Sequence, residues 1–136
     1  MTHPQLTTEA VHGLMPFAAN LGIELVSASA EESVCRMAWR KDLTTVADGF
    51  HGGALMALAD STGGIVAFLN LPEGAGTSTI SSNTVFLRAA REGVVTATAR
   101  RVHAGRSTVV VETTVCDESG RPLTRTTQTQ AVLEAR

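Results

Sequence analysis

Asp60 is the residue whose surroundings in the sequence point most directly to chemistry. It lies within Gly53–Asn70, a stretch of mostly leucine, alanine, valine, isoleucine, methionine and phenylalanine, which is typical of a helix that is buried on most sides. An unpaired carboxylate in such a helix is costly, so it is usually paired, protonated or functional. Two interpretations of Asp60 are equally good when it is taken alone. It can belong to a minor polar face of the helix with Ser61 and Thr62, or it can be a catalytic residue.

The residues directly before this helix form a second candidate site. His51, Gly52 and Gly53 stand at its start, where glycine lets a ligand approach the backbone and the first helical N–H groups are free. The positive end of the helix dipole also lies there, which makes the segment a candidate oxyanion site. A plain loop-to-helix turn would use the same residues.

The elements that must position these residues follow from periodicity and turn signals. We expect a short amphipathic helix at Thr8–Ala18, a hairpin with Glu31 and Glu32 at its turn, and the long helix, which Leu71-Pro72-Glu73-Gly74 ends. The predicted strands are Ile23–Ala30, Ser33–Trp39, Ser78–Leu87, Gly93–His103, Ser107–Cys116 and Leu123–Leu133. Short turns imply antiparallel pairing, and the result is an α+β fold with a curved sheet wrapped around one helix. We expect one domain over residues 1–136, with a loose segment at 1–10.

Composition narrows the function classes. The 136 residues are 43% hydrophobic and 18% charged, with a net charge of −2, so we expect neither a disordered chain nor a nucleic-acid partner. Cys35 and Cys116 match no metal-ligand spacing and are interpreted as small core hydrophobes. No metal and no cofactor is expected. No basic start followed by an apolar run, and no uninterrupted run of transmembrane length, is present, so we expect a soluble cytoplasmic protein without a membrane partner.

The segment around Asp60 resembles a known signature. Residues 50–60, Phe-His-Gly-Gly-Ala-Leu-Met-Ala-Leu-Ala-Asp, resemble the hotdog-fold thioesterases and look closest to the PaaI-type, phenylacetyl-CoA thioesterase-like branch. Residues 83–88, Asn-Thr-Val-Phe-Leu-Arg, and Gly105-Arg106 before a valine-rich strand also fit, and the resemblance extends from about Leu14 to Leu133. It implies a hotdog fold and hydrolysis of an acyl-CoA thioester without a serine or cysteine nucleophile.

The family's roles can be placed on this sequence. The resemblance puts the catalytic carboxylate on Asp60, as general base or nucleophile, and the oxyanion N–H on Gly52, with His51 and Gly53 beside it. The hydroxyl that holds the attacking water falls on Thr79, with Thr77 and Ser78 as alternatives. Thr45 and Gly53 are also candidates for substrate binding. Thr45 stands where the family often has an Asn or Gln that contacts the thioester, so this chain departs from the pattern there.

Helix geometry implies that the site spans two chains. Gly52 and Asp60 are eight residues apart, about 12 Å along a helix at 1.5 Å per residue. One carbonyl cannot touch both, so we expect at least a homodimer with antiparallel helices. The resemblance suggests a dimer of dimers, a homotetramer. Gly63 and Gly64 indicate close packing of this helix, either on a partner or on the chain's own sheet.

The substrate must be held at both ends. Arg88 and Arg106 are candidates for the phosphates of CoA, because the guanidinium fork suits phosphate, although both can also be ordinary solvated residues. The acyl group is left open between aromatic and medium-chain. Two other functions remain for the same fold: an acyl-CoA-binding protein without turnover, and a hotdog hydratase or dehydratase.

Overall fold

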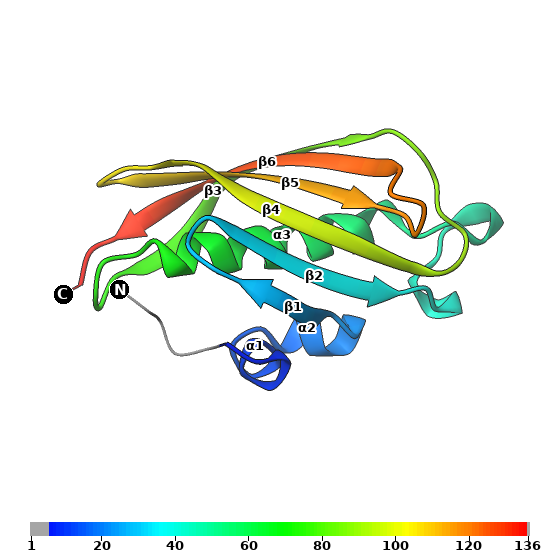
Figure 1. Cartoon of the computed structure of the whole chain (residues 1–136), viewed down its shortest axis with the longest axis horizontal. Helices are drawn as coiled ribbons and strands as arrows, with labels where there is room; N and C mark the ends of the chain where they lie inside the picture. The colour runs from blue at the N-terminus through cyan, green and yellow to red at the C-terminus, as the bar shows by residue number, and fades with distance from the viewer. Residues whose placement is uncertain (1–5, 136) are drawn as a thin grey trace.

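The computed structural model describes residues 6–135, which form one antiparallel sheet around a long helix (Figure 1). The strands are β1 (Glu24–Ala28), β2 (Glu32–Ala38), β3 (Gly76–Phe86), β4 (Val94–Ala104), β5 (Thr108–Cys116) and β6 (Pro122–Leu133), in the order β1-β2-β4-β5-β6-β3. Every neighbouring pair is antiparallel. The predicted α+β hotdog architecture is confirmed. Glu32 lies inside β2 rather than at the hairpin turn, which corrects one detail of the prediction.

The N-terminal segment forms two helices, where one was expected. Helix α1 (Thr8–Leu14) ends before Met15, and α2 (Pro16–Leu21) begins with proline. Proline suits the first helical position but cannot continue a preceding helix, which explains the break. The expected loose segment 1–10 is also partly wrong, since the Thr7 hydroxyl caps α1 by accepting from the Ala10 N–H at 3.1 Å. Residues 1–5 of that prediction lie outside the described part.

The two edges of the sheet differ in their cover. At the β1 edge, the Leu25 N–H donates to the Thr8 hydroxyl at 3.1 Å, and the His12 ring lies 2.6 Å from the Ile23 carbonyl. Helix α1 therefore covers this edge. Strand β3 forms the other edge, and most of its side chains are exposed in this chain.

Helix α3 (Gly52–Leu69) lies against the concave face of the sheet (Figure 1). By length and composition it could cross a membrane, but more than half of it is buried inside the protein, as in a core helix. The prediction of burial on most sides is confirmed, since most α3 residues are buried. One stripe of α3 is open: Gly53, Met56, Asp60 and Phe68 are exposed. The end of the helix is fixed by Asn70, whose Nδ2 donates to the Ala30 carbonyl at 2.7 Å.

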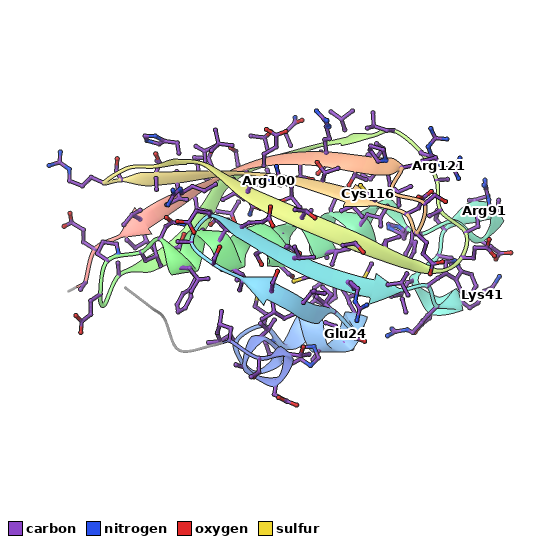
Figure 2. All side chains as sticks on the ribbon, viewed as in Figure 1. Glu24, Lys41, Arg91, Arg100, Cys116 and Arg121 are labelled. Atoms are coloured by element: carbon purple, nitrogen blue, oxygen red, sulfur yellow. The ribbon has the colours of Figure 1, made fainter. Side chains whose placement is uncertain are left out.

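The two cysteines lie on opposite faces of the sheet. Cys35 is fully buried in the core, as predicted. Cys116 (Figure 2) is only partly buried and lies on the outer face, beside Arg100 and Arg125, so its predicted core position is wrong. Burial raises the pKa of both thiols, with Asp117 contributing at Cys116. A thiolate nucleophile is therefore disfavoured at either position.

Candidate active site

Asp60 faces an open groove. In this chain the residue is exposed, rather than buried as its sequence context suggested. Protein atoms still crowd the carboxyl, and this desolvation raises its pKa, while a hydrogen bond from the Gln128 amide acts in the opposite direction. The Gln128 Nε2 donates to Asp60 Oδ1 at 3.3 Å. The chain thus holds a carboxylate that is oriented by one neutral partner and faces free space.

The groove beside Asp60 has one apolar and one polar side. Its volume is about 360 Å³, within the range of small-molecule sites. Apolar side chains from the N-terminal segment, α1 and α3 form one wall: Leu6, Val11, Leu14, Met15, Ile65 and Phe68. The opposite wall is polar and consists of Asp60, Thr77, Ser78, Thr79 and Gln130. Asp60 and all three candidate water-holding residues therefore meet in one chain.

Gln130 distinguishes between these hydroxyls. Its Nε2 donates to the Thr79 hydroxyl at 3.0 Å, which leaves the proton of Thr79 free. Thr77 instead directs its proton to the Ala131 carbonyl at 2.8 Å or to Gln130 Oε1 at 3.2 Å. Thr79 alone of these two threonines is thus left able to donate to a water in the groove.

Gln128 and Gln130 are site residues that the sequence analysis missed. They stand two apart on β6, so strand alternation places both on the same face. Both are buried, with 0% and 3% of their surface exposed. The available signal was two amides on one face of a strand that must contact the helix. Their partners, however, depend on the pairing of β6 with β3, which the sequence did not reveal.

The start of α3 presents a free N–H at Gly52. The His51 side chain caps the helix, since its Nδ1 accepts from the Gly53 N–H at 2.9 Å, and the His51 carbonyl accepts from Ala54 and Leu55. Within residues 6–135, the Gly52 N–H meets no acceptor. Gly52 rather than Gly53 therefore has the geometry of an oxyanion donor.

The ring of Phe86 packs closely on Gly52, which favours a residue without a Cβ there. A Cβ at Gly52 would lie 3.0 Å from Cε1 of that ring. Phe86 ends β3, so this contact fixes the start of α3 against the edge strand. The sequence analysis did not anticipate it.

Thr45 lies in a tightly held connection before α3. Two short 3₁₀ turns, η1 (Lys41–Leu43) and η2 (Val46–Asp48), make up this connection, and Thr45 is exposed between them. Ala47 and Asp48 adopt positive φ angles of 60° and 62°, which non-glycine residues rarely do.

Three neighbouring side chains stabilise this connection. The Trp39 indole donates to the Asp48 carbonyl at 2.9 Å, Arg91 donates to the Ala47 carbonyl at 3.1 Å, and Lys41 pairs with the Asp48 carboxylate. Figure 2 shows Lys41 and Arg91 together at the end of the molecule where α3 begins. Thr44, the neighbour of Thr45, forms a β-bridge with Phe50 just before α3, so Thr45 lies near the start of that helix, and it does not line the groove of Asp60.

The two candidate arginines lie at opposite ends of the sheet. Arg88 follows β3, where its N–H approaches the Leu123 carbonyl at 3.3 Å, near the start of α3. Arg106 is in the turn between β4 and β5, the tip at the far end in Figure 1. One chain does not bring them to a common anion site.

Gly52 and Asp60 are likewise not brought together in one chain. Helix α3 is continuous between them, so they remain about 12 Å apart along its axis. Gly52 does not line the groove. Among residues 6–135, no three His, Cys, Asp or Glu side chains gather as a metal site would require.

Comparison with known proteins identifies the family and agrees with the observed fold. Residues 49–124, more than half of the chain, match the family model described as "Thioesterase superfamily". The structure resembles that of a thioesterase from Haemophilus influenzae with a TM-score of 0.88 and 26% identity, over 96% of this chain and 93% of that one.

Two curated relatives show how far the sequence match extends. A Deinococcus radiodurans protein named "Putative esterase" is 38% identical over 104 residues, 76% of this chain and 65% of the relative. A Listeria monocytogenes 1,4-dihydroxy-2-naphthoyl-CoA hydrolase is 29% identical over 122 residues, 90% of this chain and 99% of the relative. The chain thus spans less than two thirds of the first and almost all of the second. With its sheet, its central helix and a matched segment that contains both Gly52 and Asp60, this chain belongs to the thioesterase superfamily.

Proposed function

We propose that this protein hydrolyses acyl-CoA thioesters and that it is of the PaaI type. The observation that carries the proposal is the groove in which Asp60, the only ionisable side chain among its described lining residues, faces the free hydroxyl of Thr79 beside an apolar wall. That arrangement suits a water attacking an acyl group. The CoA thioester that the Listeria relative's name specifies supports this substrate class. A cytoplasmic location remains our prediction.

The proposed reaction is a hydrolysis with Asp60 as general base. A water that accepts a hydrogen bond from Thr79 gives its proton to Asp60 while its oxygen attacks the thioester carbonyl. The Gly52 N–H stabilises the oxyanion that forms. The C–S bond then breaks, and the CoA thiolate takes up the proton. Direct attack by Asp60 through a mixed anhydride is the alternative, and the short reach of an aspartate favours the base.

The site needs a second copy of the chain to supply Gly52. The exposed edge strand β3 carries Ile80, Val85 and Phe86 at its surface, and the open stripe of α3 adds Met56 and Phe68. Exposed apolar groups of this kind on neighbouring elements support a homodimer across this side. Antiparallel packing of two α3 helices would bring Gly52 of one copy toward Asp60 of the other. The predicted dimer of dimers stays a prediction.

The nucleotide end of CoA would also use both copies. In a dimer with antiparallel helices, the Arg88 end of one copy lies beside the Arg106 end of the other, so the two arginines are no longer remote. We expect Arg106→Ala to raise KM for acyl-CoA several-fold with kcat nearly unchanged, the pattern of lost uniform binding. A short pantetheine thioester, which lacks the nucleotide, should be hydrolysed equally by both proteins. An equal rise of KM for both substrates would exclude contact between Arg106 and the nucleotide.

The acyl group is expected to lie along the apolar wall of α1 and α3. Thiol release from phenylacetyl-, benzoyl-, hexanoyl- and palmitoyl-CoA distinguishes aromatic from medium-chain preference. Asp60→Asn removes the proton acceptor but keeps the shape, and we expect kcat to fall on the order of 10²-fold or more. Turnover near that of the wild type would remove Asp60 from the mechanism, and tight binding without thiol release in the wild type would identify a non-catalytic acyl-CoA-binding protein.

Mixed oligomers test the two-chain site. One subunit carries Asp60→Asn, and the other carries Gly52→Val, whose side chain meets the Phe86 ring and blocks access to the N–H. Each homo-oligomer should be inactive, whereas the mixture should regain a working site that combines Asp60 of one copy with Gly52 of the other. An inactive mixture in which both subunits are folded and associated would contradict the shared site.

A further inference from the structure

The strand under Asp60 has an unusual buried amide. Gln128 is fully buried on the inner face of β6, yet its carboxamide makes one hydrogen bond, to Asp60. Its Oε1 is buried without a partner in the described part of the chain. A buried amide with an unpaired oxygen costs stability, so an apolar residue would be the ordinary choice at this position.

Helix α3 is shaped to receive this amide. Gly63 lies directly over it, and a Cβ at that position would come within 1.9 Å of Gln128 Oε1 and 3.3 Å of the Thr113 hydroxyl. No side chain larger than hydrogen fits there without displacing the amide. The neighbouring Gly64 has nothing within 4 Å of the same hypothetical atom, so the close approach is specific to Gly63.

The amide is oriented by what it contacts. An ionised carboxylate only accepts hydrogen bonds, so the NH₂ group faces Asp60 and the carbonyl must face Gly63. The backbone of α3 thus holds the carboxamide in the orientation that donates to the carboxylate. Since Asp60 receives no other side-chain hydrogen bond among the described residues, this contact sets the direction of its carboxyl.

We propose that Gln128 is a positioning residue, whose buried amide, seated against Gly63, orients the Asp60 carboxylate toward the groove. The inference rests on the proposed function for its catalytic meaning. The physical basis is that a neutral donor stabilises a carboxylate without adding a charge that would bind it tightly. No other titratable group lines the groove from α1, α3, β3 or β6 in the described part of the chain. Among residues 6–135, Gln128 is therefore the one side chain that opposes the desolvation of Asp60.

The test replaces Gln128 by methionine, which keeps its length and removes the donor. We expect kcat to fall about tenfold with KM nearly unchanged, as for loss of one hydrogen bond to a charged group. The acidic limb of the kcat–pH profile should move to higher pH, because the carboxylate loses the hydrogen bond from Gln128. The carboxyl ¹³C resonance of Asp60, followed by NMR in the free protein, should show the same upward shift of its midpoint.

Thr126→Val is the matched control. Thr126 lies on the same face of β6, is equally buried, and bonds to Thr84 at 2.8 Å rather than to Asp60. It should leave the Asp60 titration unchanged. If Gln128→Met does not fold, Gly63→Ala displaces the same amide from the helix side and should give the same shift.

The titration separates this inference from the proposed function. An Asp60 midpoint that is the same in the wild type and in Gln128→Met would overturn the positioning role, even if Asp60→Asn is inactive. A shifted midpoint with an unchanged kcat–pH profile would also overturn it, since the orientation would then not matter to turnover. An active Asp60→Asn protein would instead remove the catalytic proposal, while the NMR result would still decide whether Gln128 controls the carboxylate.

Discussion

The two halves of the sheet's inner face are built from different residues although they pack on the same helix. On β2, β4 and β5 most of the inward side chains are apolar and buried: Cys35, Met37, Val95, Ala97, Ala99, Val109, Val111 and Val115, with Ser33 and Thr113 as the polar exceptions. On β6 the consecutive inward residues are polar and just as buried: Thr124, Thr126, Gln128 and Gln130. The inner face is thus apolar on one side and polar on the other.

The apolar half mainly stabilises the fold, whereas the polar half orients the residues of the candidate site. Apolar side chains gain free energy from burial whatever their exact direction, so the first half holds α3 without constraining any one atom. In the described part of the chain, each half leaves two polar atoms buried without partners: the Ser33 and Thr113 hydroxyls in the first half, and the Thr124 hydroxyl and Gln128 Oε1 on β6. Each such atom costs stability, and the polar half also buries the most amide groups. In return it fixes the directions of Asp60 and Thr79 through Gln128 and Gln130.

Leu58→Ala should weaken the packing of α3 on the apolar half of the sheet and cause the largest loss of stability. Leu58 is fully buried in the core with Met37 and Val95. Truncation leaves a cavity, and we expect the free energy of unfolding to fall by about 3 kcal/mol. Urea denaturation measures the loss, and the folded variant should keep its kcat, because Leu58 does not line the groove. A loss no larger than that of Thr126→Val would contradict the assignment of stability to this half.

Alanine substitutions at Gly63 and Gly64 should differ in their effect on stability, because only Gly63 contacts the polar half of the sheet. Gly64→Ala meets no atom, so it should stabilise the helix by up to about 1 kcal/mol. Gly63→Ala forces the buried amide of Gln128 to move, and we expect a loss of roughly 1–3 kcal/mol from overpacking. Thermal unfolding at matched protein concentration compares the two. Equal stabilisation by both would show that the amide adapts without cost.

The elements were predictable from sequence because their local patterns are strong. The long helix and six strands were placed within two residues of their observed bounds, since each is bounded by glycine, proline or charged turn residues. The order of the strands was not predictable, because β3 pairs with β6 far along the chain. This one long-range pairing decides which hydroxyls meet Asp60 and places Arg88 and Arg106 at opposite ends.

The site was only partly predictable for the same reason. Asp60 stands out because it interrupts an apolar helix, and the structure places Thr79 in the same groove, although their catalytic roles remain predictions. The sequence suggested that Asp60 is buried, because the residues around it are apolar. Composition alone, however, does not show which face of an apolar helix is left open in a single chain. Gln128 gave only one local signal, its spacing of two from Gln130, and an amide in a threonine-rich strand is equally typical of an exposed face.

The smallest expected effect is the dependence of stability on the charge of Asp60. In the folded chain its pKa is raised, chiefly by desolvation, so the folded state binds a proton more tightly than the unfolded state. Stability conferred by that proton is fully present below the ordinary aspartate pKa and is lost as pH rises through the raised value. The amide introduced by Asp60→Asn carries no charge to desolvate, so this variant should be more stable than the wild type at neutral pH. The difference should vanish at acidic pH, provided both proteins remain folded and equally associated there.

Chemical denaturation at a series of pH values measures this difference in stability between the wild type and Asp60→Asn. Gln128→Met should enlarge the pH dependence of the wild-type stability, because the hydrogen bond that opposes desolvation of Asp60 is lost. If Asp60→Asn were less stable than the wild type at neutral pH, the charged form of Asp60 would be stabilised in the fold. The contacts from the polar half of the sheet would then favour the carboxylate more than desolvation disfavours it.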